Sequence, residues 1–122
     1  MNVEGKAAIV TGASRGVGRA TAIALAKLGC AVCVNYSRSK VEAMGVLEEL
    51  TELGDNAMTF QADVSDDAAV QEMVAATMET FGRLDVLVNN AATTQFIPHS
   101  HLDGVTDDIW RRILAITLSE HF

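Results

Sequence analysis

The sequence lacks the features of membrane-spanning, secreted and nucleic-acid-binding proteins. No apolar stretch approaches the about 20 residues that a membrane-spanning helix needs, and the first ten residues, MNVEGKAAIV, lack the basic start and long apolar core of a signal peptide. The 9 basic residues are scattered and are outnumbered by 16 acidic residues, which leaves no basic patch for a phosphate backbone. We therefore expect a cytoplasmic protein that binds neither membranes nor nucleic acids.

Proline and low-complexity tracts are also scarce, so no segment has the composition of a linker between domains. Pro98 is the one proline, and 122 residues is the length of one ordinary domain. Of these residues 49% are hydrophobic and 20% are charged, which is the balance of a chain that folds around a core. We expect a single domain over residues 1–122.

Cysteine is limited to Cys30 and Cys33, which form a C-x-x-C pattern. The surrounding residues are typical of a strand, in which residues three apart point to opposite faces. The pattern therefore favours two buried, reduced thiols over a redox or zinc site. His99 and His101 have no carboxylate or cysteine cluster at ligand spacing, and we interpret them as solvated loop residues. No metal site is expected.

Strand-like and helix-like patterns alternate along the chain. The expected strands are 6–11, 31–35, 57–62 and 84–88, and the expected helices are 17–28, 39–53, 65–81 and 106–122. This alternation predicts an α/β protein with a doubly wound parallel sheet, right-handed crossovers and helices on both faces. Such a sheet binds ligands beyond the carboxyl ends of its strands, at the point where the strand order reverses.

Apolar residues at helical spacing predict which helix faces lie against the sheet. The residues expected to point inward are Val17, Ala20, Ala24 and Leu28 in the first helix, Val41, Met44, Leu47 and Leu50 in the second, Val70, Met73, Val74, Met78 and Phe81 in the third, and Ile109, Ile113 and Ile116 in the last. Ser39 and Ser65 are expected to cap the second and third helices, while Gly29 and Gly54 end the first and second.

The stretch VTGASRGVG, residues 10–18, places glycines between the first expected strand and the first helix. Gly12, Gly16 and Gly18 form a G-x-x-x-G-x-G pattern, which differs from a P-loop and from the commoner G-x-G-x-x-G. Glycine lets bare backbone approach a ligand, and the following helix start offers unpaired N–H groups and a partial positive charge. The loop thus suits a pyrophosphate. The alternative is that the glycines serve tight packing alone.

The end of the second expected strand indicates which dinucleotide would bind. An NAD site normally has an acidic residue about 20 residues beyond the glycine turn, where it accepts the ribose 2′-hydroxyl. Here the stretch is Asn35, Tyr36, Ser37 and Arg38, without an acid. Arg38 and Arg15, the arginine of the glycine loop, both suit a 2′-phosphate, so NADP(H) is preferred over NAD(H). Alternatively, Arg38 merely solvates the start of the next helix.

These motifs resemble those of the short-chain dehydrogenase/reductase family. Residues 11–18 are similar to its T-G-x-x-x-G-x-G cofactor motif, Asp63 and Val64 to the pair that contacts adenine, and residues 89–91 to the start of its N-N-A-G motif. The resemblance implies the N-terminal portion of a Rossmann-like fold, a homo-oligomer, and an NADP(H)-dependent oxidoreductase acting on an alcohol/carbonyl pair. The implied cofactor-binding residues are Gly12, Ser14, Arg15, Gly16, Val17, Gly18, Asn35, Tyr36, Ser37, Arg38, Asp63, Val64, Asn90, Ala91 and Ala92.

The sequence departs from the family pattern at several positions. Ala92 stands where the motif has glycine, and Thr117 where an asparagine supports a proton-relay water. The family's catalytic serine and Tyr-x-x-x-Lys lie further along its chain. Tyr36 and Lys40 have that spacing, but they follow the second strand, where we expect no catalytic role. We therefore expect a cofactor-binding part without catalytic groups, inactive on its own.

Two other functions are compatible with parts of this pattern. A non-catalytic nucleotide-binding or interaction module would share the glycine loop and lack catalytic groups. A methyltransferase of similar architecture is disfavoured, because the acid expected for a ribose is missing after the second strand.

Overall fold

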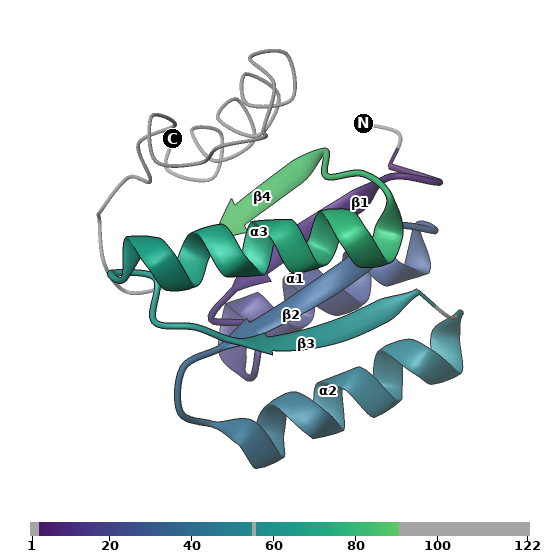
Figure 1. Cartoon of the computed structure of the whole chain (residues 1–122). Helices are drawn as coiled ribbons and strands as arrows, with labels where there is room; N and C mark the ends of the chain where they lie inside the picture. Colours follow the sequence, from purple (N-terminus) through teal and green to yellow (C-terminus); the bar gives the residue numbers. More distant parts are fainter. Residues whose placement is uncertain (1–2, 55, 91–122) are drawn as a thin grey trace, which may run out of the picture.

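The computed structural model describes residues 3–54 and 56–90. In this part of the chain a parallel sheet has the strand order β3-β2-β1-β4, with helices on both faces (Figure 1). The elements are β1 (Ala7–Thr11), α1 (Gly16–Lys27), β2 (Ala31–Tyr36), α2 (Lys40–Leu53), β3 (Ala57–Gln61), α3 (Asp67–Phe81) and β4 (Val86–Asn89). The predicted alternation and parallel sheet are confirmed, with bounds shifted by a residue or two.

Several sequence predictions concern residues outside the described part. These are the helix expected over 106–122, the loop histidines, and the site candidates Ala91, Ala92 and Thr117. The single domain over residues 1–122 also stays a prediction, since the described residues cover only part of that range. Within the described residues, no helix is both long enough and apolar enough to cross a membrane.

The strand order reverses between β1 and β4. From β1 the chain moves outward to β2 and then β3, and after α3 it returns to the other side of β1. In the register, Val10 lies opposite Val34 of β2 and Val88 of β4. The carboxyl ends of β1 and β4 therefore flank the reversal point, where open α/β sheets bind ligands.

Two apolar clusters fill the space between the sheet and the helices. One contains Val10, Val32 and Val34 with residues of α1 and α2, and the other contains Ile9 and Cys33 with residues of α3. Neighbouring strand residues thus bury opposite faces of the sheet, as pleating requires. α1 and α2 cover one face, and α3 covers the other (Figure 1).

The predicted inward face of α1 is wrong. Val17 is 71% exposed and Leu28 57% exposed, and the other two predicted residues, Ala20 and Ala24, are also exposed. The buried residues are Gly18 and Ala22, which have the same helical spacing on a different face. Small residues are buried here because they bring α1 close to the sheet and to the loop before it.

The predicted face of α2 is partly wrong, whereas that of α3 is confirmed. In α2 the buried residues are Ala43, Val46 and Leu50, while Val41 is 82% and Met44 43% exposed. The α2 face lies against α1, with which it shares an ion pair between Arg19 and Glu49. In α3 the stripe buries Val70, Met73 and Val74, with Met78 and Phe81 packed at its edge.

The helix caps differ from the predictions in detail. Ser39 occupies the N-cap of α2 but makes no capping hydrogen bond with its side chain. Asp66, not Ser65, caps α3, where its Oδ1 accepts from the N–H groups of Ala68 and Ala69 at 3.0 and 3.3 Å. Ser65 lies one residue before the N-cap, and its hydroxyl donates to Asp63 at 2.6 Å. As predicted, Gly29 and Gly54 follow the ends of their helices.

Candidate functional site

The loop between β1 and α1 requires its glycines for two different reasons. Gly12 and Gly16 have φ angles of +59° and +65°, a left-handed conformation that costs other residues about 1–2 kcal/mol. Gly18 lies in the first turn of α1, where a Cβ atom would stand 2.3 Å from the carbonyl oxygen of Gly12. The loop and the helix start are therefore in backbone contact, and the G-x-x-x-G-x-G pattern follows from this geometry.

The N-terminus of α1 can receive an anion. Its N-cap residue Arg15 makes no capping hydrogen bond, and its first turn contains no acidic residue. The first N–H groups of a helix have no acceptor within the helix, and they carry its partial positive charge. A Cβ atom added at Gly16 would meet none of the residues that the structure describes within 4 Å, so they leave the space beside this backbone open. A phosphate group fits these donors.

Asn35 connects the start of the loop to two neighbouring strands. Its side chain is buried, and Oδ1 accepts from the N–H of Gly12 at 3.2 Å. Its Nδ2 donates to the carbonyl oxygens of Phe60 at 3.3 Å and Ala62 at 3.1 Å. Its own carbonyl accepts from the N–H of Ala13 at 3.0 Å. Asn35, predicted as a cofactor-binding residue, thus has its side chain directed into the scaffold.

Thr11 makes the corresponding connection between β1 and β4. Its hydroxyl lies 3.0 Å from Oδ1 of Asn89 and 3.3 Å from the carbonyl oxygen of Val88, and it accepts from the N–H of Asn90 at 2.9 Å. The side-chain nitrogen of Asn90 is buried and has no hydrogen-bond partner among the residues that the structure describes. A buried amide nitrogen without a partner beside the glycine loop is compatible with a ligand at this edge.

The end of β2 separates into a buried and an exposed part. Tyr36 is 7% exposed and belongs to the core, whereas Ser37 and Arg38 are exposed. Gln61 of β3 donates from Nε2 to the carbonyl oxygen of Ser37 at 3.0 Å, which fixes the peptide that precedes Arg38. Within the described residues, Arg38 takes part in no ion pair. Its guanidinium is therefore available to an anion bound at the carboxyl ends of the strands.

Asp63 stands after β3 with one carboxylate oxygen engaged. Its Oδ1 accepts from the hydroxyl of Ser65 at 2.6 Å and from the backbone N–H of that residue at 2.9 Å. These two hydrogen bonds, the hydroxyl first, hold the pKa of Asp63 below its usual value, and the charge of Arg38 adds to the effect. Asp63 is thus a fixed carboxylate, and Val64 beside it packs against the α3 side of the core.

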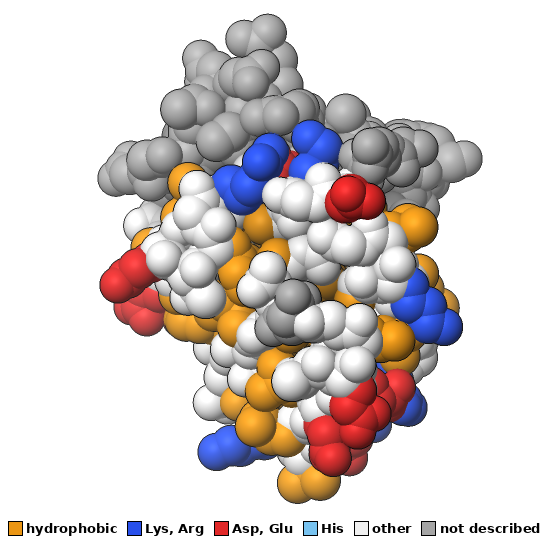
Figure 2. Space-filling model, turned by 90° about the vertical axis from the view of Figure 1, so that its right-hand side faces the viewer, with side chains coloured by type: hydrophobic (Ala, Val, Ile, Leu, Met, Phe, Trp, Pro, Cys, Tyr) orange, Lys and Arg blue, Asp and Glu red, His pale blue; other side chains and the backbone are white. Residues whose placement is uncertain are grey.

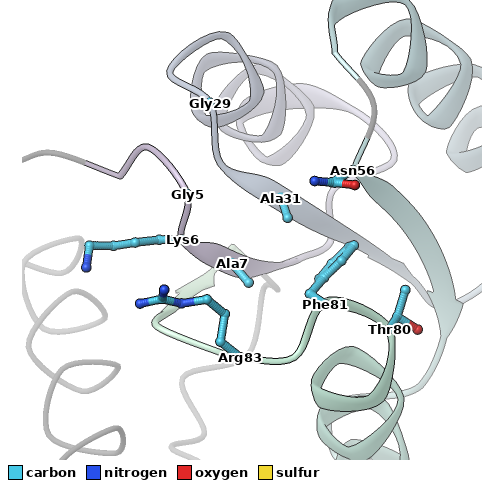
Figure 3. A pocket seen from close by; sticks show the side chains of 9 residues that line it. All are labelled: Gly5, Lys6, Ala7, Gly29, Ala31, Asn56, Thr80, Phe81 and Arg83. Atoms are coloured by element: carbon cyan, nitrogen blue, oxygen red, sulfur yellow. The ribbon is translucent and has the colours of Figure 1, made fainter.

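Two cavities lie at the amino ends of the strands, on the edge of the sheet opposite to the glycine loop. Figure 2 shows the molecule from the side of these amino ends. One, of about 150 Å³, has Lys6, Asn56, Phe81 and Arg83 in its wall, where the two basic side chains lie next to each other (Figure 3). The other, of about 180 Å³, lies between the ends of α1 and α2. Neither is at the reversal point, and the helix N-terminus and Arg38 favour the carboxyl edge as the candidate site.

Sequence reasoning missed Asp85, a buried acid directly before β4. Its side chain is 5% exposed, accepts from the N–H of Ala7 at 3.1 Å and forms a two-point ion pair with Arg83. Burial acts to raise the pKa of Asp85, but these hydrogen bonds and the Arg83 and Lys6 charges together lower it. The sequence signal that could have revealed Asp85 is its place as an acidic residue inside the otherwise apolar run 84–88. Its role is structural, because it lies at the amino edge.

The two cysteines are buried on opposite faces of the sheet, as predicted. Burial raises the pKa of Cys30 and that of Cys33 to about 11, so both are protonated at neutral pH. Thiols in that state are poor nucleophiles and poor metal ligands. Among the described residues, no group of His, Cys, Asp and Glu could hold a metal ion.

The structure brings most of the predicted site residues to one edge. Those that lie in the β1–α1 loop and α1 start are Gly12, Ser14, Arg15, Gly16, Val17 and Gly18, and those after the other strands are Ser37, Arg38, Asp63, Val64 and Asn90. Asn35 and Tyr36 reach the same edge but are buried. The strand order, its reversal point and this loop define an α/β protein of the Rossmann type.

The chain belongs to the short-chain dehydrogenase family, whose model it matches over residues 6–122. It is 46% identical over 109 residues to the short-chain dehydrogenase/reductase homolog YusS of Bacillus subtilis, which covers 89% of this chain and the whole of that protein. The family resemblance and the fold class predicted from the sequence are confirmed.

Solved structures of the family give the same fold. A short-chain dehydrogenase from Burkholderia cenocepacia in complex with NADP is 39% identical with a TM-score of 0.72, and the match covers 95% of this chain and 46% of that one. A family member from Burkholderia phymatum in complex with NAD is 31% identical with a TM-score of 0.68, over 72% of this chain and 31% of that one. The chain thus spans less than half of these two proteins.

Proposed function

We propose that this chain is the NADP(H)-binding part of an oxidoreductase that acts on an alcohol/carbonyl pair. The observation that carries the proposal is the open, acid-free start of α1 on the same edge of the sheet as Arg38. The N–H groups of residues 14–17 would hold the pyrophosphate, Arg38 the 2′-phosphate, and Asp63 the adenine. A bound nicotinamide would supply or accept hydride at the substrate carbon.

The preference for NADP(H) rests on Arg38 and on the missing acid after β2. An acidic residue there would repel a 2′-phosphate, whereas a guanidinium pairs with it through two parallel hydrogen bonds. Family members similar to this chain have been solved with NADP and with NAD, so the choice depends on local residues. In this chain the peptide before Arg38 is fixed by Gln61, which presents the arginine in a defined place.

The family's catalytic serine, tyrosine and lysine lie further along its chain, and Tyr36 cannot replace the tyrosine because it is buried in the core. We infer that the 122-residue chain binds cofactor without turnover. A location in the cytoplasm and a homo-oligomeric assembly belong to the same proposal.

A second candidate function is a non-catalytic nucleotide-binding or interaction module. It is favoured by one observation, the match over the entire length of the Bacillus subtilis homolog, a protein that is similarly short. The leading candidate and a nucleotide-binding module share the cofactor site, and they differ in whether the chain contributes to turnover together with further polypeptide or to no turnover at all.

Titration of the purified chain with NADPH, NADH and S-adenosylmethionine tests the proposal. We expect NADPH to bind about 10- to 100-fold more tightly than NADH, as a charge-assisted contact worth about 1.5–3 kcal/mol implies. Arg38→Ala should remove this preference, whereas the matched control Lys40→Ala, an exposed cation two residues away, should retain it. Tighter binding of NADH, or binding of S-adenosylmethionine alone, would contradict the assignment.

A further inference from the structure

We propose that Asn35 is a positioning residue that presets the glycine loop for the pyrophosphate, acting through the backbone of Gly12 and not by contact with the cofactor. The inference deepens the proposed function and rests on it. Its basis is the set of hydrogen bonds around Asn35, which join the loop after β1 to β2 and to the end of β3 at a single buried side chain.

The Asn35 side chain has no free N–H donor left for a ligand. A side-chain amide has two N–H donors, and here Nδ2 donates to the carbonyl oxygens of Phe60 and Ala62. Oδ1 accepts from Gly12, and the residue is only 2% exposed. A side chain that is buried and used in this way orders its neighbours.

The same hydrogen bonds decide which part of the loop can hold an anion. The N–H of Gly12 is used by the Asn35 side chain, and the N–H of Ala13 by the Asn35 carbonyl. Phosphate oxygens are therefore left with the N–H groups from Ser14 onward. The next peptide, whose N–H belongs to Ala13, carries the Gly12 carbonyl against which Gly18 lies, so the position of Gly12 influences where α1 begins.

Asparagine is suited to this position because it presents an acceptor to the loop after β1 and donors to the end of β3 at once. Aspartate would face two carbonyl oxygens with a charged oxygen in a buried place, and alanine would reach neither strand. Without the side chain, the loop would have to be ordered when the cofactor binds, at a cost in affinity. That cost falls on every ligand with a pyrophosphate, whereas loss of Arg38 affects only those with a 2′-phosphate.

The test compares Asn35→Ala with wild type in titrations with NADPH, NADH and 2′-AMP, which has the adenine and the 2′-phosphate but no pyrophosphate. We expect the variant to bind NADPH and NADH about tenfold more weakly, by the same factor for both, and to bind 2′-AMP as wild type does. Thr77→Ala is the matched control. Thr77 is also fully buried, but its hydroxyl lies on the other face of the sheet, where its partners are the Met73 carbonyl of α3 and the Cys33 thiol.

A ligand-free measurement supports the same comparison. In amide hydrogen exchange of wild type, Gly12 and Ala13 should both be protected. In Asn35→Ala, Gly12 should lose protection while Ala13 keeps it, because its acceptor is the backbone carbonyl of residue 35. If the alanine variant does not fold, Asn35→Ser gives the same comparison with a polar side chain that is too short to reach both strands.

The outcomes separate this inference from the proposed function. If wild type binds none of the three nucleotides, the proposed function fails and the inference fails with it. Wild-type binding together with unchanged NADPH affinity in the Asn35 variant overturns the inference alone. A loss for NADPH but not for NADH would make Asn35 a 2′-phosphate residue, and an equal loss for 2′-AMP would make it part of the adenosine site. Either result overturns the positioning role.

Discussion

Among single residues, Gly18 places the strictest limit on the loop. A methyl group there would stand 2.3 Å from the carbonyl oxygen of Gly12, which is backbone and cannot move aside as a flexible side chain can. We expect Gly18→Ala to push the loop away from the start of α1. Isothermal titration should then show NADPH affinity reduced by about tenfold or more, since misplacement of binding groups by about 1 Å is costly.

Gly45→Ala is the control for this prediction. Gly45 lies within α2, is exposed, and would place a Cβ atom with nothing within 4 Å. The substitution should raise the free energy of unfolding by about 0.5–1 kcal/mol through helix propensity and leave NADPH affinity unchanged. Equal NADPH affinity in Gly18→Ala and wild type would show that the contact between Gly12 and Gly18 serves packing alone.

The hydrogen bonds of Asn35 show why the sequence predicted some features of single site residues and not others. The glycines could be predicted because positive φ angles and close backbone approach restrict the residue type. The direction of the Asn35 side chain could not, because its partners Phe60 and Ala62 come from a strand 25 residues or more away in the sequence. Only the sheet order places β2 between β1 and β3.

For the secondary-structure elements, the hydrophobic pattern predicted their type and order but not every face. In α1 two stripes have helical spacing, one with Val17 and Leu28 and one with Gly18 and Ala22. Hydrophobicity favours the first, but the backbone contact of Gly18 with the loop selects the second. In α3 a single apolar stripe exists, and its prediction is confirmed.

The attachment of β4 to β1 gives a pH-dependent prediction for Asp85. The Asp85 carboxylate accepts from the N–H of Ala7, and the backbone N–H of Asp85 donates to the carbonyl oxygen of Ala7 at 2.9 Å. Its pKa in the folded protein is lowered, so its contribution to stability is fully present above the unfolded-state pKa of about 3.9. That contribution is lost as the pH falls through the lower folded-state value.

We therefore expect Asp85→Asn to reduce the free energy of unfolding by about 1–3 kcal/mol at pH 7. The difference from wild type should be constant down to about pH 5 and shrink below about pH 4, as measured by urea denaturation. Glu72→Gln, which removes an exposed carboxylate from α3, should leave the profile unchanged. A difference that persists undiminished at pH 2 would show that side-chain shape, and not the charge of Asp85, stabilises this junction.

For the molecule as a whole, the start of the glycine loop is tied into the sheet from two sides. Asn35 connects Gly12 to β2 and β3, and Thr11, the last residue of β1 before the loop, connects to the end of β4. A loop held in this way should not open while the sheet stays folded. Binding of a cofactor at the loop should therefore stabilise the entire fold and not just one segment of it.

This cooperativity can be measured by thermal unfolding of the full chain with and without NADPH. At a free concentration 100 times its dissociation constant, NADPH should raise the free energy of unfolding by about 2.7 kcal/mol. For a domain of this size that corresponds to a rise in Tm of roughly 10 °C, whereas Gly18→Ala, if it binds NADPH about tenfold more weakly, should show about half of that rise at the same concentration. If titration shows binding but the Tm rises much less than this, the loop opens before the sheet unfolds. The hydrogen bonds of Thr11 and Asn35 would then be local contacts and not the connection that makes loop and sheet one cooperative unit.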